Sequence, residues 1–174
     1  MTRPRGARGL PAPGLPPFDE VVTAHGGAVL RISRGLLPPA DAEDAAAEAL
    51  LAALEAYPRL QPDSNVRAWL VTITRRKALD VLRRQARQAV PVDQLPERAV
   101  SDEPDTPDDA LWAAVRALPN KQRHAVAYRY AADLSYADVA ALLGGTEAAA
   151  RRAAADGIAA LRRALPHPAS EVTS

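Results

Sequence analysis

The chain has 174 residues, of which 48% are apolar and only 4% aromatic, and its formal net charge is +1. This length allows one medium domain or two small ones, and the abundance of Ala, Leu and Val favours helices packed by small side chains over a thick β core. The absence of cysteine excludes disulfides, thiol catalysis and the common zinc frameworks, and no apolar run reaches the length of about 18 residues that a membrane span needs.

The N-terminal part of the chain predicts a disordered tail followed by a helix. Residues 1–17 are rich in Pro, Gly and Arg and lack the apolar core of a secretory signal, so we expect a cytoplasmic protein without membrane insertion. Apolar residues then recur at helical spacing from Phe18 to Ile32. The Pro-Pro pair at 38–39 is expected to end this helix, because proline lacks the backbone donor that a helix interior requires.

Two further helices complete a first domain over residues 18–90. Asp41 is the predicted N-cap of a second helix, rich in Ala and Leu, that runs to about Tyr57. The third helix is the stretch NVRAWLVTITRRKALDVLRRQAR, which either Ser64 or Asn65 can cap.

This third helix is strongly basic, with seven basic residues and a single acid, Asp80. The side predicted to bury against the preceding helices consists of Val66, Trp69, Leu70 and Ile73. A roughly opposite arc includes Thr72, Arg75, Arg76 and Arg83. Arginine presents a planar, permanently charged fork that suits phosphate and base edges, whereas a solvated face normally mixes charges of both signs. The arc therefore favours contact with nucleic acid, and a solvated helix face is the alternative.

The segment 91–107 differs in character and predicts a linker. Between residues 91 and 109 the chain has seven acids, four prolines and one basic residue, Arg98, which is typical of an extended flexible connection. A second helical domain is expected over 108–165, followed by a frayed tail at 166–174.

The second domain contains a helix-turn-helix pattern. Ser135 is placed to cap one helix, the Gly-Gly pair at 144–145 to end it, and Thr146 to cap the next. The second helix of such a pair enters a DNA major groove with its N-terminal residues near base edges. Here these residues include Arg151 and Arg152. An ordinary helical hairpin is the alternative.

Two blocks of sequence resemble the extracytoplasmic-function class of bacterial sigma factors, within the sigma-seventy family. DAEDAAAEALLAAL followed by NVRAWLVTITRRKALDVLRR resembles the second conserved region, with its W-L-x-x-I helix that ends in L-D-x-L-R-R. LPNKQRHAVAYRYAADLSYADVAALLG resembles the fourth conserved region, and the resemblance covers about residues 18–165. It implies an all-α fold of two small helical domains, a sigma region-2-like bundle and a sigma region-4-like helix-turn-helix, joined by the flexible acidic linker.

The resemblance implies a sigma factor that binds core RNA polymerase, directs promoter recognition, helps to open the DNA and starts transcription, without cofactor or covalent chemistry of its own. An anti-sigma factor is a further candidate partner. The polymerase-binding surface would include Asp41, Asp44, Glu48 and Leu51. The minus-ten element would be taken by Ser64, Asn65, Arg67, Thr72, Arg75, Arg76 and Arg83. The minus-thirty-five element would be read by Ser135, Tyr136, Thr146, Glu147, Arg151 and Arg152.

Two rival classes of protein stand beside this interpretation. An enzyme is disfavoured because the chain lacks the common phosphate-loop, zinc-protease and serine-hydrolase motifs, and its three histidines are scattered, so no catalytic residue or metal ligand is assigned. The other is a sigma-like interaction or regulatory protein with weakened promoter recognition. It is favoured by Ala153, Asp156 and Ile158, which replace basic residues usual in the family's recognition helix. Arg152 and Asp156 are also spaced to form an ion pair.

Overall fold

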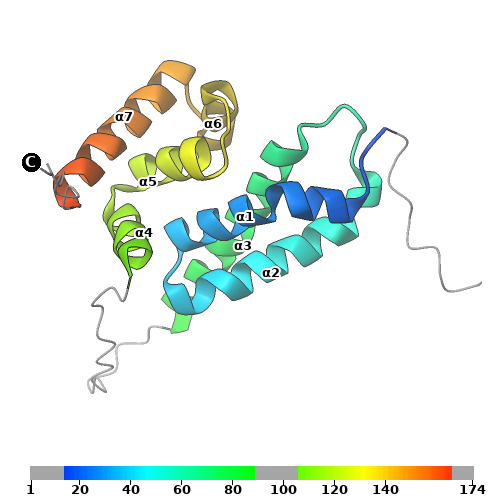
Figure 1. Ribbon diagram of the computed structural model, residues 1–174, viewed down its shortest axis with the longest axis horizontal. Coiled ribbons are helices and arrows are strands. Elements are labelled where there is room, and N and C mark those ends of the chain that lie inside the picture. The colour runs from blue at the N-terminus through cyan, green and yellow to red at the C-terminus, as the bar shows by residue number, and fades with distance from the viewer. Residues whose placement is uncertain (1–13, 89–105, 166–174) are drawn as a thin grey trace, which may run out of the picture.

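The computed structural model describes residues 14–88 and 106–165, and every regular element in these ranges is helical (Figure 1), which confirms the all-α fold class. The first range contains α1 (Phe18–Leu36), α2 (Pro39–Ala56), the 3-10 turn η1 (Tyr57–Arg59) and α3 (Val66–Gln88). The second contains α4 (Pro107–Ala117), α5 (Asn120–Val126), the π-helical turn η2 (Ala127–Ala131), α6 (Tyr136–Leu143) and α7 (Glu147–Ala164). None of these helices is both long and apolar enough to cross a membrane.

Parts of three predicted segments lie outside the described residues: the N-terminal tail up to residue 13, the acidic linker up to residue 105, and the C-terminal tail from residue 166. The disorder or flexibility expected for them stays a prediction. The end of the N-terminal tail is described, and there the Pro16 carbonyl accepts a hydrogen bond from the Tyr57 hydroxyl at 2.7 Å. These last tail residues therefore pack on the first bundle.

The first bundle consists of α1, α2 and α3. The inner side of α2 is made of small residues, and Ala42, Ala45, Ala46, Ala49 and Ala53 are all buried. Such side chains let neighbouring helix axes approach closely. Larger rings fill one end of this core, where the centroid of the Tyr57 ring lies 5.1 Å from that of Phe18 and 6.0 Å from that of Trp69. The apolar side of α3 thus packs inward, as its pattern predicts.

The starts of α2 and α3 differ in how well the sequence predicts them. The prediction that Asp41 caps α2 is wrong, since the helix already begins at Pro39 with Pro38 at the cap position and Asp41 lies within the first turn. Proline is favoured at the first helical position because its missing N–H would have no partner there. Of the two candidate caps of α3, Ser64 and Asn65, the structure uses Asn65, whose Oδ1 accepts a hydrogen bond from the Ala68 N–H at 3.0 Å.

The second bundle consists of α4 to α7 and follows its predicted caps closely. The hydroxyl of Ser135 accepts from the Asp138 N–H at 3.1 Å, and that of Thr146 accepts from the Ala149 N–H at 3.2 Å. Gly144 ends α6 with φ of 72°, in the left-handed region that glycine adopts without a steric penalty. The helix-turn-helix is therefore present as expected.

One element of the second bundle is irregular. After Pro119 the chain forms the α-helix α5, which changes to the π-helical turn η2 at Ala127. Asp133, just beyond η2, has φ of 53°, which is unusual for a residue other than glycine. The irregular segment contacts α1 of the first bundle.

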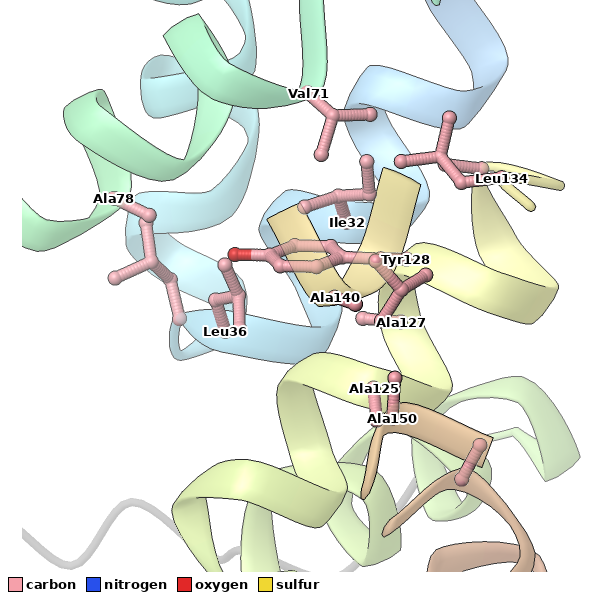
Figure 2. Packing of buried hydrophobic residues seen from close by; sticks show 14 of the residues in the cluster. Ile32, Leu36, Val71, Ala78, Ala125, Ala127, Tyr128, Leu134, Ala140 and Ala150 are labelled. Atoms are coloured by element: carbon pink, nitrogen blue, oxygen red, sulfur yellow. The ribbon is translucent and has the colours of Figure 1, made fainter. Parts of the chain in front are cut away.

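The two bundles pack against each other and share one hydrophobic cluster (Figure 1). The first bundle contributes Ile32, Leu36, Leu37, Ala42, Ala45, Val71 and Ala78, and the second contributes Ala125, Ala127, Tyr128, Ala132, Leu134, Val139, Ala140, Ala150 and Ala154. Figure 2 shows the ring of Tyr128, from η2, lying among Ile32 and Leu36 of α1 and Val71 of α3. The sequence left the relative placement of the domains open, and the structure brings them together.

Candidate nucleic-acid and polymerase surfaces

The basic helix α3 is fixed by its apolar side. Leu70, Val71, Thr74 and Ala78 are buried, and the Thr74 hydroxyl donates to the Leu70 carbonyl at 2.8 Å, so that no polar group is left unpaired there. Val66, Trp69 and Ile73 are partly buried against the core of the first bundle. A helix held along one side in this way presents its remaining side chains in a fixed direction.

The predicted minus-ten residues of α3 fall into two groups. Arg76 and Arg83 are exposed, and Arg83 forms an ion pair with Asp80 at 3.4 Å. Arg67 and Arg75 are half-buried and face the second bundle: Arg67 pairs with Asp133 at 3.0 Å, and the Nε of Arg75 is buried. The helix therefore does not present all its arginines on one open face.

The remaining minus-ten candidates have mostly structural partners. The Thr72 hydroxyl donates to the Ala68 carbonyl at 2.9 Å. Asn65 caps the helix through its oxygen, and its amide nitrogen lies 3.5 Å from a carboxylate oxygen of Asp138 in the second bundle. Ser64 is half-buried in the preceding loop, and its backbone N–H donates to the Gln61 carbonyl at 3.1 Å.

In the helix-turn-helix, the ring of Tyr136 makes cation–π contacts with two arginines. The guanidinium carbon of Arg151 lies 5.0 Å from the centroid of the Tyr136 ring, and that of Arg129 lies 5.2 Å from it. A hydrogen bond with Tyr130 lowers the pKa of Tyr136, and the neighbouring Arg129 and Arg151 lower it further. The hydroxyls of Ser135 and Thr146 serve as helix caps, so they are already occupied by backbone groups.

The ion pair in the recognition helix α7 differs from the expected one. Arg151 pairs with Glu147 at 2.7 Å, one turn earlier, whereas no pair of Arg152 with Asp156 forms among the described residues. Arg152 is exposed next to it. The Arg152–Asp156 pair that the spacing allows is thus not formed, and the ion pair of this helix joins Glu147 and Arg151 instead.

The predicted polymerase-binding residues lie on α2, and some of them already have partners on α3. Asp44 is exposed, Glu48 pairs with Lys77 of α3 at 3.5 Å, and Asp41 accepts a hydrogen bond from Gln85 of α3 at 2.8 Å. Leu51 is 61% exposed, and Leu54 on the next turn is 50% exposed. The sequence interpretation did not assign Leu54 to a site, although its apolar character at a solvent-facing position was the available signal.

The histidines of the described ranges do not form a metal site, since no group of three His, Cys, Asp or Glu side chains there could hold an ion. His124 of α5 is half-buried and its ring lies 5.6 Å from that of Tyr128. Burial lowers the pKa of His124, a hydrogen bond with the Asn120 carbonyl raises it, and the charges of Arg75 and Arg123 lower it again. Neutral His124 is thus favoured between the two bundles.

Comparisons with known families match both bundles. The family model described as Sigma-70 region 2 matches residues 21–88, and the model described as Sigma-70, region 4 matches residues 108–161. The first match covers α1 to α3, and the second covers the helix-turn-helix together with α4 and α5.

Individual proteins extend this similarity along the chain. The chain is 28% identical over 151 residues to the RNA polymerase sigma-E factor of Streptomyces antibioticus, covering 85% of this chain and 84% of that protein. It is 33% identical over 107 residues to the ECF RNA polymerase sigma factor EcfG of Rhodopseudomonas palustris (strain TIE-1), covering 59% of each. The fold is similar, with a TM-score of 0.69 and 21% identity, to the sigma factor RpoE of Bartonella quintana crystallised with the anti-sigma factor NepR, covering 84% of this chain and 95% of that one.

Proposed function

This chain belongs to the extracytoplasmic-function class of the sigma-70 family, and from that premise we propose which of its surfaces meet polymerase and DNA. As a sigma factor it binds core RNA polymerase and directs it to promoters, where transcription starts. The observation that carries the proposal is the presence on neighbouring helices of an exposed apolar and acidic face (α2) and an exposed basic face (α3). We propose that binding is its whole contribution and that it performs no covalent step.

The apolar and acidic face of α2 is the proposed polymerase contact. Leu51 and Leu54 are two large apolar side chains left in solvent, and Asp44 and Glu55 are exposed on the same helix. Exposed apolar side chains rimmed by polar groups mark protein interfaces. The acids would steer the approach of a basic partner surface, while the leucines supply the area that is buried on contact.

The basic face of α3 is the proposed contact with the minus-ten element. Arg76 and Arg83 are exposed on a helix whose other side is held by the core, so their charges lie at a fixed place relative to the bundle. Cations placed in this way bind DNA phosphates and release counterions. Arg67 and Arg75 belong to the same helix and are proposed to join this contact when the second bundle no longer covers them.

The recognition helix α7 is the proposed reader of the minus-thirty-five element. Arg151 and Arg152 lie in its first two turns and are exposed, and Tyr136 and Glu147 hold Arg151 in place. The first turns of a recognition helix are the part that reaches base edges. We also propose an anti-sigma factor as a regulatory partner, which is supported by the fold likeness to a sigma factor crystallised with one.

The test is reconstitution with core RNA polymerase on a promoter template. We expect Leu51→Asp to lower the capture of polymerase and Arg76→Ala to leave capture intact while lowering promoter binding. For Arg76→Ala, the slope of log affinity against log salt should fall by about 0.7–0.9, the contribution of one phosphate contact. The matched controls are Ala24→Asp on α1 and Arg163→Ala on α7, both at exposed positions outside the proposed surfaces. Equal behaviour of test and control variants would contradict the assignment.

A further inference from the structure

The chain enters the first bundle beside the connection between α2 and α3 (residues 57–65). The Tyr57 hydroxyl donates to the Pro16 carbonyl at 2.7 Å, and Leu15 packs against the same hydrophobic cluster as Tyr57. Tyr57 is almost fully buried, and burial raises its pKa, so its hydroxyl stays protonated and can donate. Figure 1 shows the first described residues, in dark blue, next to η1. Residues 14–17, called the strap here, are therefore fixed to this end of the bundle.

Gly14 sets the direction from which the chain reaches the strap. Its φ of 101° lies in the region that favours glycine, so the backbone turns here in a way that would strain any other residue. A Cβ built at Gly14 would lie 3.6 Å from the Cβ of Pro62, so this turn touches the connection between α2 and α3. The preceding segment, residues 1–13, thus joins the bundle close to Ser64 and Asn65, which are candidate minus-ten contacts.

The segment of residues 1–13, called the arm here, carries charge of one sign. It contains Arg3, Arg5 and Arg8, and no acid occurs before Asp19. A segment that only needs to be solvated normally carries charges of both signs, whereas arginines gathered without acids are the electrostatic mark of nucleic-acid binding. Arginine-rich arms that adjoin DNA-binding domains reach into the neighbouring minor groove. The charge of the arm therefore points to DNA as its partner.

The connection between α2 and α3 has no net charge of its own to offer to DNA. Over residues 57–65 the one cation, Arg59, is balanced by one acid, Asp63. Arg67, in the first turn of α3, is paired with an acid of the second bundle at 3.0 Å. The exposed Arg76 lies ten positions after the first residue of α3, which is about 15 Å along the helix axis. DNA held at this connection thus lacks cations that the arm can supply.

The length of the arm suits this place. A chain spans at most about 3.6 Å per residue, so Arg8 can lie up to roughly 20 Å from Gly14 and Arg3 up to roughly 40 Å. B-DNA rises about 3.4 Å per step, so these arginines can reach DNA up to roughly twelve base pairs from the strap. We propose that the strap delivers the arm to the duplex beside the minus-ten element, where the arm arginines bind the minor groove and its phosphates. This inference rests on the proposed function of the minus-ten surface.

Removal of the three arm charges tests the contact with DNA. In the full chain with core polymerase, Arg3→Ala with Arg5→Ala and Arg8→Ala should lower the slope of log promoter affinity against log salt by about 0.9 for each arginine that contacts a phosphate. Affinity itself should fall at least about tenfold at low salt. The matched control changes the same three residues to Lys, which keeps the charges and should keep the slope. An unchanged slope in the alanine variant, or an equal loss in the lysine variant, would overturn the proposal.

Capture of core polymerase without DNA separates the two macromolecules that a basic arm can meet. We expect the alanine variant of the arm to capture polymerase as the wild type does. A loss of capture that accounts for the fall in promoter binding would assign the arm to polymerase and overturn the proposal. Arg76→Ala, measured in parallel, reports on the proposed function itself. If Arg76→Ala lowers the salt slope and the arm variant does not, the arm proposal alone fails; if neither lowers it, the minus-ten surface fails as well.

A cleavage probe locates the arm on the promoter. The chain has no cysteine, so Ala7→Cys provides a single thiol between Arg5 and Arg8, and an iron chelate tethered there cuts nearby DNA. We expect cuts within about ten base pairs of the bases that the connection between α2 and α3 protects, given the reach of seven residues from Gly14. Ala24→Cys, at an exposed position of α1, is the control and should not give these cuts. Cuts that are absent or farther away would contradict delivery beside the minus-ten element.

The same probe tests the strap. Leu15→Asn with Tyr57→Phe removes the apolar contact and the hydrogen bond that hold residues 14–17, while the ring at position 57 keeps its place in the core. We expect the cuts from the probe at position 7 to spread over more base pairs and to weaken, because the start of the arm is no longer fixed. Leu10→Asn makes the same change of side chain outside the strap and is the control. A cut pattern as sharp as that of the control would overturn the role of the strap.

Discussion

The two basic helices proposed to meet DNA, α3 and α7, hold their arginines in different ways. On α3, Arg67 donates to Asp133 of the other bundle and Arg75 lies half-buried under it. On α7, Arg151 pairs with Glu147 of its own helix and Arg152 is exposed. The packing of the two bundles therefore covers part of one of these helices and leaves the other accessible. The arginines of α3 depend on contacts from the other bundle, whereas those of α7 depend only on their own.

The largest change in this comparison is expected from Tyr128→Ala. Removing a fully buried ring from the hydrophobic cluster that the two bundles share should cost about 3–5 kcal/mol in the free energy of unfolding, the range for large buried aromatics. Urea denaturation followed by circular dichroism measures it. Tyr128→Phe is the control: the hydroxyl has no hydrogen-bond partner among the residues that the structure describes, so its loss should leave stability unchanged or raised. Tyr130→Ala, at a residue 53% exposed, should change little. Similar losses at Tyr128 and Tyr130 would contradict the burial of Tyr128.

The next largest effect is expected from Gly157→Ala, which tests how closely α7 packs on α5. A Cβ at Gly157 of α7 would lie 2.6 Å from a methyl carbon of Val126 on α5, which is too close for an ordinary contact. We expect Gly157→Ala to cost about 1–3 kcal/mol, as overpacked cores do. Thermal unfolding would show it. Gly145→Ala is the control, because a Cβ there would meet no atom within 4 Å in the described part of the chain, its two sequence neighbours aside. If the two variants melt alike, α7 is not seated on α5 as described.

A smaller effect is expected in the pH dependence of stability, through His124 of α5, which lies near Arg75 of α3. Burial lowers the pKa of His124 below its ordinary value of 6.5, so the unfolded chain takes up a proton before the folded chain does. The stability from neutral His124 is complete above pH 6.5 and is lost as pH falls through the lowered pKa. The charged groups that act on it are Arg75 of α3 and Arg123 of α5, and both repel the protonated form. In His124→Gln, we expect the free energy of unfolding to fall less than in the wild type as the pH is lowered from about 7 to 5.

The pKa of His25 is also lowered, so His25 contributes to the pH dependence of stability in the same sense, and its contribution must be subtracted. Burial lowers its pKa, and so does the charge of Arg67. His25→Gln measured over the same pH range isolates that contribution. If the wild type and His124→Gln lose stability in parallel, His124 does not sense the interface.

The smallest expected effect concerns α7 alone. Asp156 is exposed one turn beyond Arg152 and should repel the DNA backbone. In the full chain with core polymerase, Asp156→Arg should tighten promoter binding mainly at low salt and steepen the slope of log affinity against log salt by about 0.9 per added phosphate contact. Asp19→Arg on α1 provides an equal charge change away from this helix. No gain over that control would mean that this face of α7 does not meet DNA.

Features that depend on a few adjacent residues could be predicted from the sequence. The caps at Ser135 and Thr146 and the stop at Gly144 are local, since a side-chain oxygen or a positive φ decides each within one turn. Asp41 shows the limit of such patterns. It has the chemistry of a cap, but the rigid Pro38-Pro39 pair already sets the helical start two residues earlier.

Features that depend on contacts between distant segments could not be predicted. Arg67 and Asp133 are 66 positions apart in sequence, so the resemblance placed Arg67 among DNA contacts with no sign of its partner. The π-helical turn has no local signal either, because AYRYA has no proline or glycine to interrupt a regular helix. The roles of Arg76, Arg152 and Leu51 stay predictions that the proposed reconstitution tests.

The π-helical turn also has a consequence for how this protein can evolve. In η2 the Ala132 N–H donates at 3.2 Å to the carbonyl of Ala127, five residues back instead of four. Loss of one codon in this turn would restore the ordinary spacing and rotate the preceding residues by about 100° relative to those that follow. The buried ring of Tyr128 would then point in another direction relative to the residues that follow the turn. A single in-frame deletion or insertion can therefore change how the second bundle packs on α1, without any change to the arginines of α3 or α7.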